Sequence, residues 1–190
     1  SFPAILRDGT DIYNYPENSA SGSSMLYKYN SEDDSVSVIK QLSNQPLTDA
    51  IITKIDDSSY IFTTEIPTQN GNKLSIYTAL DDMESYKLIQ NITLFDNTAR
   101  SAGDIFVDNG KIVRPAQNCN GGYGVGLVFQ EIIKDSKGDF VLKELFRRKP
   151  IKNYIGMHTY NQYKGCYVVD LHARRYPYLH KCLQFLKNLM

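Results

Sequence analysis

The chain has 190 residues, of which 42% are hydrophobic and 22% are charged, and its 21 Lys and Arg residues balance its 21 Asp and Glu residues. This composition is typical of a globular chain with enough apolar residues to bury a core. A formal charge of zero gives no general attraction to nucleic acid or to an anionic membrane, so we expect neither as a partner.

The sequence shows neither an apolar run long enough for a membrane span nor the pattern of a signal peptide. We therefore expect a soluble protein, and the compartment stays unknown at this stage. The three cysteines, Cys119, Cys166 and Cys182, lack the spacing of a zinc site or of a disulfide framework. We accordingly expect no metal ion and no cofactor.

A hairpin pattern recurs along the chain. Four segments each combine a short apolar strand, a tight-turn signal and a second strand of β-branched or aromatic residues. They are 3–15, 50–63, 103–114 and 157–170. In the first three units we expect a third strand over 24–29, 73–78 and 125–132, and a fourth over 36–39, 86–89 and 140–144. The units follow one another at intervals of roughly 50 residues, with four strands in each complete unit.

This repeat predicts an all-β fold, because four strands in a repeat of this length are typical of a propeller blade. We expect a β-propeller domain over 1–175, with blades at about 1–44, 45–96 and 97–150 and a partial blade at 151–175. A β-sandwich is the alternative, but a sandwich does not explain a sustained period.

The pattern changes after Asp170. Apolar side chains then recur at three- and four-residue steps, which is typical of one helical face. They are Tyr178, Leu179, Cys182, Leu183, Phe185, Leu186 and Leu189. We expect a short C-terminal helix over 176–190 that covers exposed sheet.

Polar residues concentrate where the hairpins meet. Glu17 and Gln117 each follow the second strand of their unit, whereas Asp49 and His158 lie near the start of the first. Equivalent positions in successive blades converge on one axis, so such residues can meet in one funnel. The candidate catalytic residues are Asp49 and Glu17, because glycoside cleavage uses two carboxyl groups as acid and base. The candidate ligand-binding residues, which offer charge, amide groups, imidazole or an aromatic ring, are Arg100, Arg114, Gln117, Tyr123, His158 and Asn161.

Each of these residues also has a structural interpretation. Arg114 and Glu17 can form an ion pair between blades, and a lone histidine among polar neighbours is more often a structural residue than a catalyst. The absence of Trp weakens the case for a sugar-stacking platform, although the 14 tyrosines can replace it.

Seven short motifs resemble one known family. They are Phe2-Pro3-Ala4-Ile5, Tyr15-Pro16-Glu17, Thr48-Asp49, Arg100-Ser101-Ala102-Gly103, Val113-Arg114-Pro115-Ala116-Gln117-Asn118-Cys119, Tyr123-Gly124 and His158-Thr159-Tyr160-Asn161. From Phe2 to about Asp170, the chain resembles the propeller domain of the glucosamine inositolphosphorylceramide transferase N-terminal family. That family is similar in turn to the five-bladed, furanosidase-like glycoside hydrolases such as family 43.

The resemblance implies a five-bladed propeller with a funnel that faces carbohydrate, and it makes Asp49 similar to the carboxylate that tunes or orients the acid in family 43 enzymes. Members carry an Asp-Pro-Phe type motif in a first blade, and its aspartate resembles the general base. No such motif precedes Phe2 here. Either the given sequence begins after this motif, or the protein has lost the blade and hydrolysis with it. We expect an incomplete propeller that lacks its first blade, with a gap covered by the C-terminal helix, a second copy of the chain or a partner domain.

Two functions are consistent with these residues. The first is a glycoside hydrolase-like propeller that cleaves a glycan with Glu17 and Asp49. The second is a non-catalytic glycan-binding or scaffolding propeller, accessory to a glycosyltransferase or to polysaccharide synthesis, and the missing aspartate favours it. The sequence leaves open whether the chain is an enzyme.

Overall fold

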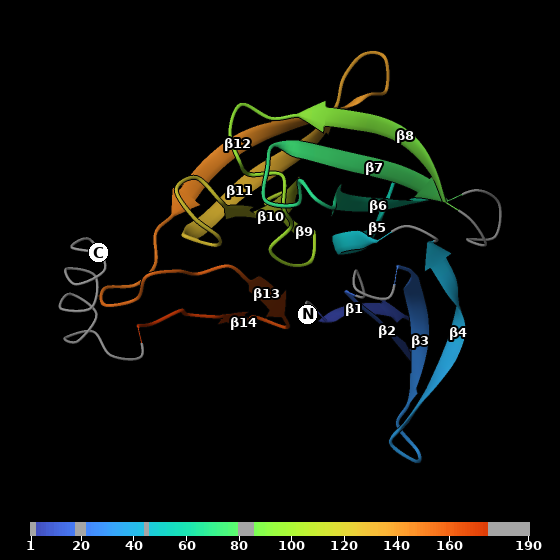
Figure 1. Ribbon diagram of the computed structural model, residues 1–190. Coiled ribbons are helices and arrows are strands. Elements are labelled where there is room, and N and C mark those ends of the chain that lie inside the picture. Colours follow the sequence, from blue (N-terminus) through green and yellow to red (C-terminus); the bar gives the residue numbers. More distant parts are fainter. Residues whose placement is uncertain (1–2, 18–21, 44–45, 80–85, 175–190) are drawn as a thin grey trace.

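The computed structural model describes residues 3–17, 22–43, 46–79 and 86–174 of the chain (Figure 1). These residues form fourteen strands and no α-helix. The helix expected over 176–190 lies outside the described residues. Within the described ranges, no helix has the length and apolarity needed to cross a membrane.

Twelve strands form three antiparallel sheets of four strands, and the last two strands form a hairpin. The first sheet contains β1 (Pro3–Asp8), β2 (Asp11–Pro16), β3 (Ser24–Asn30) and β4 (Ser35–Ser43). The second contains β5 (Leu47–Ile55), β6 (Ser58–Glu65), β7 (Lys73–Ala79) and β8 (Tyr86–Thr93). The third contains β9 (Phe106–Asp108), β10 (Lys111–Asn118), β11 (Gly126–Lys134) and β12 (Phe140–Arg148). The hairpin contains β13 (Tyr160–Tyr163) and β14 (Cys166–Val169).

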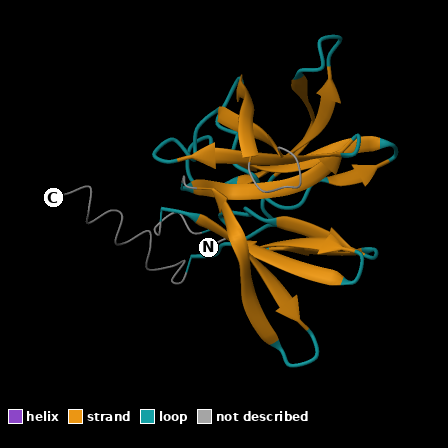
Figure 2. Cartoon of the chain, turned by 90° about the vertical axis from the view of Figure 1, so that its right-hand side faces the viewer, coloured by secondary structure: helices purple, strands orange, loops and turns teal. Residues whose placement is uncertain are grey.

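The sheets are arranged radially. The first strand of each unit lies toward the centre of the molecule, and the outer strands β4, β8 and β12 lie at its periphery (Figure 1). Seen from the side, the first sheet diverges from the others instead of stacking on them as one of two layers (Figure 2). This is the arrangement of propeller blades and not that of a sandwich.

Two hairpin turns have the backbone conformation that their Asp, Asn and Gly residues predict. Asp56 and Asp57 have φ angles of 49° and 62°, and Asn109 and Gly110 have φ angles of 48° and 76°. Two consecutive positive φ angles are typical of the type I′ turn, whose twist matches that of the strands it joins. Asp, Asn and Gly adopt this left-handed region at the lowest cost.

The second strand of the second sheet illustrates how the core is built. Five consecutive residues of β6 are buried, although successive side chains of a strand point to opposite faces. Ile61 packs into a cluster shared with Leu26 and Ile51, and Phe62 packs into another shared with Phe140. A blade with neighbours on both sides buries both faces in this way.

Polar contacts also join neighbouring sheets. The Tyr15 hydroxyl accepts a hydrogen bond from the backbone N–H of Ile52 (3.0 Å), which ties the first sheet to the second. The Arg7 guanidinium lies over the ring of Tyr163, 4.7 Å from the centroid, and brings the hairpin against β1. The first strand and the final hairpin are therefore neighbours in space.

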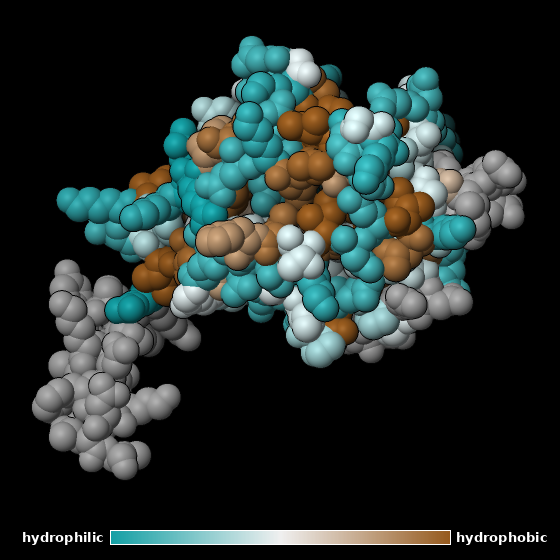
Figure 3. Space-filling view, turned by 90° about the horizontal axis from the view of Figure 1, so that it is seen from above, coloured by the Kyte–Doolittle hydropathy of each residue, from teal (hydrophilic) through white to brown (hydrophobic). Residues whose placement is uncertain are grey.

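The outer strands keep some apolar surface. Figure 3 looks onto the side of β8 and β12 and shows hydrophobic side chains among hydrophilic ones. Leu88 and Ile89 of β8 and Val141 and Phe146 of β12 are exposed. The hydrophobic core therefore lies mainly between sheets, and the peripheral strands are only partly covered.

The fourth unit differs from the expectation at its start. Its first strand was expected from residue 157 and begins at Tyr160. The backbone N–H groups of His158 and Thr159 instead donate to Oδ1 of Asp170. The Asp170 side chain therefore accepts the two N–H groups that would otherwise pair with a neighbouring strand.

Candidate functional site

A β-bulge at the start of β5 places the side chain around which the site is organised. The pairing of β5 with β6 is irregular between Thr48 and Ile51, so Asp49 and Ala50 together occupy the space of one residue. Asp49 has a φ angle of 45°, in the left-handed region that Asp tolerates better than most residues. The bulge directs its carboxyl group inward, where only 2% of the residue is exposed.

Arg100 connects this carboxylate to three other side chains. Its Nε lies 2.5 Å from Oδ2 of Asp49, its Nη1 donates to Oδ1 of Asn70 (2.7 Å), and its Nη2 lies 3.9 Å from Oε2 of Glu17. The ring of Tyr123 lies against the guanidinium, with 4.8 Å between Cζ and the ring centroid. Every nitrogen of the Arg100 side chain thus has a partner in the protein.

Gln117 forms the floor of the site. Its Nε2 donates both to Oδ2 of Asp49 (3.0 Å) and to the carbonyl oxygen of Ser101 (2.9 Å). Oδ2 of Asp49 therefore accepts hydrogen bonds from two side chains. Oδ1 of Asp49 and Oε1 of Gln117 are also buried, but neither accepts a hydrogen bond from the described residues.

The electrostatic environment makes Asp49 unusual. Burial raises its pKa to about 6, Arg100 opposes this rise, and the neighbouring Glu17 carboxyl adds to it. A buried carboxyl group beside a second carboxyl group resists ionisation, because the charged form loses hydration and meets a like charge. Asp49 can therefore exchange a proton closer to neutral pH than an ordinary aspartate does.

His158 lies on the other side of Tyr123, with 5.1 Å between the ring centroids. Its Nδ1 contacts Oδ2 of Asp170, while Oδ1 of Asp170 accepts the backbone N–H groups of His158 (2.9 Å) and Thr159 (2.6 Å). Burial lowers the pKa of His158, and Asp170 acts in the opposite direction. The imidazole is thus held in one orientation next to an exposed aromatic ring.

Gly124 allows the Tyr123 loop to approach His158. It has a φ angle of 59°, and a Cβ atom at this position would lie 2.5 Å from Cβ of His158. Its carbonyl oxygen accepts the backbone N–H of Met157 (2.9 Å). The absence of a side chain at residue 124 therefore fixes the spacing between the two aromatic groups.

Arg114 lies beneath the site and is completely buried. Its Nη1 donates to Oε1 of Gln130 (2.7 Å) and to the carbonyl oxygen of Thr98 (3.4 Å), and its Nη2 donates to the carbonyl oxygen of Ala99 and to Oγ of Ser101. The alternative pairing of Arg114 with Glu17 is not found, because Glu17 contacts Arg100 instead.

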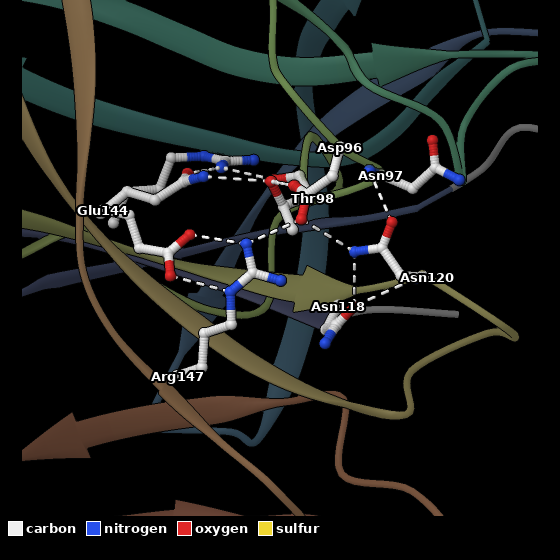
Figure 4. A network of polar contacts seen from close by, with 9 residues as sticks. Asp96, Asn97, Thr98, Asn118, Asn120, Glu144 and Arg147 are labelled. Atoms are coloured by element: carbon white, nitrogen blue, oxygen red, sulfur yellow. Dashed lines mark hydrogen bonds and ion pairs between the residues drawn. The ribbon is translucent and has the colours of Figure 1, made fainter.

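A second network holds the loop that carries Arg100. Oδ2 of Asp96 accepts hydrogen bonds from Arg147 (2.7 Å) and from Asn120 (3.1 Å), and its Oδ1 accepts one from Oγ1 of Thr98 (2.9 Å). Figure 4 shows Arg147 placed between Glu144 and Asp96, with Asn120 on the far side. The segment before Arg100 is therefore fixed from both β12 and the loop that follows β10.

The structure brings most of the expected residues together. Those within the network of contacts around Arg100 are Glu17, Asp49, Gln117, Tyr123 and His158. Arg114 lies one layer deeper, where both of its Nη atoms donate to the protein and its buried Nε has no partner among the described residues. Asn161 lies at the junction of the third sheet and the hairpin, where its Oδ1 accepts the backbone N–H of Asp104 (3.2 Å).

Two residues of the site were missed in the sequence. Asn70 belongs to the segment between β6 and β7, and Asp170 follows the last strand. Neither lies in a position that the repeat marks as equivalent to Asp49 or Glu17, so the period gave no signal for them. Among the described residues, no group of three His, Cys, Asp or Glu side chains could hold a metal ion.

Comparison with known proteins identifies the family. Residues 1–171 match the family described as glucosamine inositolphosphorylceramide transferase 1, N-terminal. The chain belongs to this family. The resemblance inferred from the sequence motifs is therefore confirmed. A search of curated proteins gave no match.

Solved structures show the same fold. A family 43 β-1,3-galactosidase solved with galactodeoxynojirimycin has a TM-score of 0.58 and 14% identity over 77% of this chain and 46% of its own. A bifunctional GH43-CE protein from Bacteroides eggerthii has a TM-score of 0.56 and 15% identity over 89% of this chain and 22% of its own. The chain thus has the propeller fold of these proteins and spans less than half the length of either.

Proposed function

We propose that the polar cluster around Arg100 is a glycan-binding site. The observation that carries this proposal is the layered arrangement of the cluster. Asp49 and Gln117 are buried and fixed, whereas Tyr123 is 48% exposed and its ring lies against the guanidinium of Arg100. An exposed aromatic ring beside a few oriented polar groups is the combination by which proteins bind sugars, whose rings have an apolar face and polar edges.

The comparisons support a carbohydrate ligand. One solved relative in fold is a β-1,3-galactosidase, and the family takes its description from a glucosamine inositolphosphorylceramide transferase. Both descriptions concern sugars. The site in this chain lies at the ends of strands from three different sheets, as the funnel of a propeller requires.

Glycan binding is tested with an array of glycans and with titration calorimetry on the strongest ligand. We expect Tyr123→Ala to weaken binding at least tenfold, because the variant loses the aromatic ring on which a sugar would stack. Tyr29→Ala is the matched control, since Tyr29 is a partly exposed tyrosine that contacts Asp34 in the β3–β4 hairpin. No binding by the unmodified chain, or equal losses in both variants, would refute the proposal.

Hydrolysis is the second candidate, and the raised pKa of Asp49 favours it. However, Asp49 and Glu17 contact the same guanidinium group, whereas the two carboxyl groups of a glycosidase flank the scissile bond at roughly 5 Å or more. A screen of aryl glycosides with the unmodified chain and with Asp49→Asn tests this candidate. Cleavage that depends on Asp49 would establish it, and cleavage by neither protein would leave binding as the function.

We also propose a five-bladed ring, with three blades from the four-stranded sheets and part of a fourth from the hairpin. The exposed side of β14 supports this, because Tyr167 and Val168 point into solvent there and β14 has a strand partner on one side only. An experimental structure of the natural protein in which no further strands pair with β14 would contradict it.

A further inference from the structure

Phe95 is the most exposed large apolar side chain among the described residues. It is 104% exposed, whereas the next, Tyr167, is 71% exposed. Single apolar side chains at the surface are common, so exposure alone does not indicate a function. The segment that carries Phe95 connects β8 to β9 and continues to Arg100. Whether Phe95 has a role therefore depends on the backbone that holds it and on its neighbours.

The backbone on both sides of Phe95 is fixed by hydrogen bonds. Before it, the N–H of Leu94 donates to the carbonyl oxygen of Asn72 (2.8 Å), and Nδ2 of Asn72 donates to the carbonyl oxygen of Leu94 (3.0 Å). After it, the N–H of Asn97 donates to Oδ1 of Asn120 (3.1 Å), and Figure 4 shows these two residues facing each other. The segment cannot fold Phe95 inward without losing these hydrogen bonds, so it presents the ring to solvent in a defined place.

Both loops that fix this segment also carry residues of the site. The loop between β6 and β7, which holds the backbone before Phe95, carries Asn70, whose Oδ1 accepts a hydrogen bond from Arg100 (2.7 Å). The loop between β10 and β11, which holds the backbone after Phe95, carries Tyr123, whose ring contacts the same guanidinium group. Phe95 is therefore held between two loops of the site, at the same end of the sheets.

The spacing of the two exposed rings suits a ligand longer than one sugar. The carbonyl oxygen of Asn97 accepts the backbone N–H of Cys119 (2.9 Å). Phe95 precedes Asn97 by two positions, and Tyr123 follows Cys119 by four. Since a chain spans at most about 3.6 Å per residue, the Cα atoms of Phe95 and Tyr123 lie less than about 30 Å apart. A fully exposed Phe95 ring does not pack against Tyr123, so the two rings are separate contact points on linked loops.

Exposed amide side chains accompany Phe95 on these segments. They belong to Asn70, Asn97 and Asn120, and each amide can both donate and accept hydrogen bonds. A sugar needs a ring for its apolar face and polar groups for its hydroxyls. A protein partner instead needs a contiguous apolar patch around its central contact. The surroundings of Phe95 therefore suit a sugar.

We propose that the glycan site continues from Tyr123 to Phe95 and that its ligand is an oligosaccharide with one of its sugars on each ring. This inference rests on the proposed glycan binding. The loop of Phe95 is already fixed, so little conformational freedom is lost when a sugar stacks on the ring. A monosaccharide bound at Tyr123 makes no use of Phe95. Affinity should therefore rise with the length of the glycan.

The dependence on length is tested by calorimetry with the full chain and with cello-, chito-, manno- and galacto-oligosaccharides, each from the monosaccharide to the hexasaccharide. In a series that binds, we expect the affinity to rise at least tenfold once the glycan reaches Phe95 and then to stay constant. In Phe95→Ala, the affinity for the hexasaccharide should fall to that for the monosaccharide, with the thermal midpoint retained because the side chain is exposed.

Two further variants act as controls. Phe95→Tyr keeps an aromatic ring and should keep the gain with length. Tyr167→Ala removes an exposed aromatic residue of the hairpin and should keep it too. Affinity that does not depend on length, a gain that survives in Phe95→Ala, or a gain lost in Tyr167→Ala would overturn the inference and leave the proposed function intact. Failure of every glycan, in the array and in these series, would instead refute the proposed function.

The contact itself is tested by carbon-13 NMR of the phenylalanine rings, with the signal of Phe95 assigned by its loss in Phe95→Ala. A saturating amount of the hexasaccharide that binds should shift this signal, and the corresponding monosaccharide should not. An unshifted Phe95 signal with the hexasaccharide, or an equal shift with the monosaccharide, would overturn the inference.

Discussion

Arg100 and Arg114 lie in consecutive layers of the same region, yet they have opposite environments. Arg114 is completely buried among neutral oxygens, and burial lowers its pKa to about 9. The side chain of Arg100 is 12% exposed and lies among carboxylates and an aromatic ring. The comparison indicates that Arg114 stabilises the layer beneath the site, whereas Arg100 organises the surface that we propose to bind a glycan.

The largest expected effect is the loss of stability in Arg114→Met. The substitution removes the N–H groups that donate to Gln130, Ser101 and two carbonyl oxygens, and it leaves these acceptors buried. We therefore expect the free energy of unfolding to fall by about 3–5 kcal/mol. Urea denaturation followed by circular dichroism measures it. Arg100→Met should cost less, about 1–2 kcal/mol, because Asn70 is exposed and Asp49 keeps the hydrogen bond from Gln117. Equal losses would show that the two layers do not differ as described.

The next effect concerns the contact between Gly124 and His158. Gly124→Ala and Gly138→Ala both place an alanine at a positive φ angle, but only a Cβ at residue 124 meets another atom within 4 Å. We expect about 1 kcal/mol of destabilisation at residue 138 and a further 1–3 kcal/mol, roughly, at residue 124. Thermal denaturation of both variants measures the difference. If both lose the same stability, the approach of the Tyr123 loop to His158 is not constrained by the glycine.

A third prediction compares a buried carboxyl group, that of Asp104, with an exposed one, that of Asp8. Asp104 has no cation among the causes of its shift, and burial alone raises its pKa to about 6. Because the folded state then binds more protons than the unfolded state between about pH 4 and pH 6, its contribution to stability falls as the pH rises through this window. The free energy of unfolding of Asp104→Asn should therefore rise, relative to that of the unmodified chain, by about 1–2 kcal/mol from pH 4 to pH 6.

Denaturation at both pH values with Asp8→Asn as a control decides this prediction. Asp8 is an exposed residue of β1. The prediction is contradicted if the stability difference between Asp104→Asn and the unmodified chain is the same at both pH values. It is also contradicted if Asp8→Asn shows the same change with pH.

The smallest expected effect is at the surface. Nζ of Lys28 lies 2.8 Å from Oδ2 of Asp11, and both side chains are well exposed. Exposed ion pairs typically contribute less than about 1 kcal/mol, because water and salt screen the charges. Lys28→Ala should therefore change the denaturation midpoint only slightly. A loss as large as that of Arg100→Met would show that pairs at the periphery matter as much as those at the site.

The strands were predictable because each hairpin carries its own local signals. The turn at Asn109 and Gly110 and the alternation around it fix a hairpin without any distant contact. The fourth unit was less accessible, since the start of β13 depends on hydrogen bonds to Asp170. A tertiary contact of that kind leaves no periodic trace in the sequence.

The sequence predicted which residues belong to the site but not how deeply each side chain is buried. The repeat placed Arg114 and Gln117 near the same end of their blade, but five consecutive residues of β10 are buried, so alternation does not reveal which side chain reaches the surface. Asn70 and Asp170 escaped notice because their roles come from contacts with Arg100 and His158 that are distant in sequence.

The contact between Arg7 and Tyr163 has a consequence for how the protein is made. Each pair of adjacent strands is close in sequence, so a sheet can form with little loop-closure entropy as soon as its own strands have left the ribosome. The contact of Arg7 with Tyr163 must wait until the last hairpin has been synthesised. We therefore expect vectorial assembly, sheet after sheet from the N-terminus, with the joining of β1 and the final hairpin as the last event.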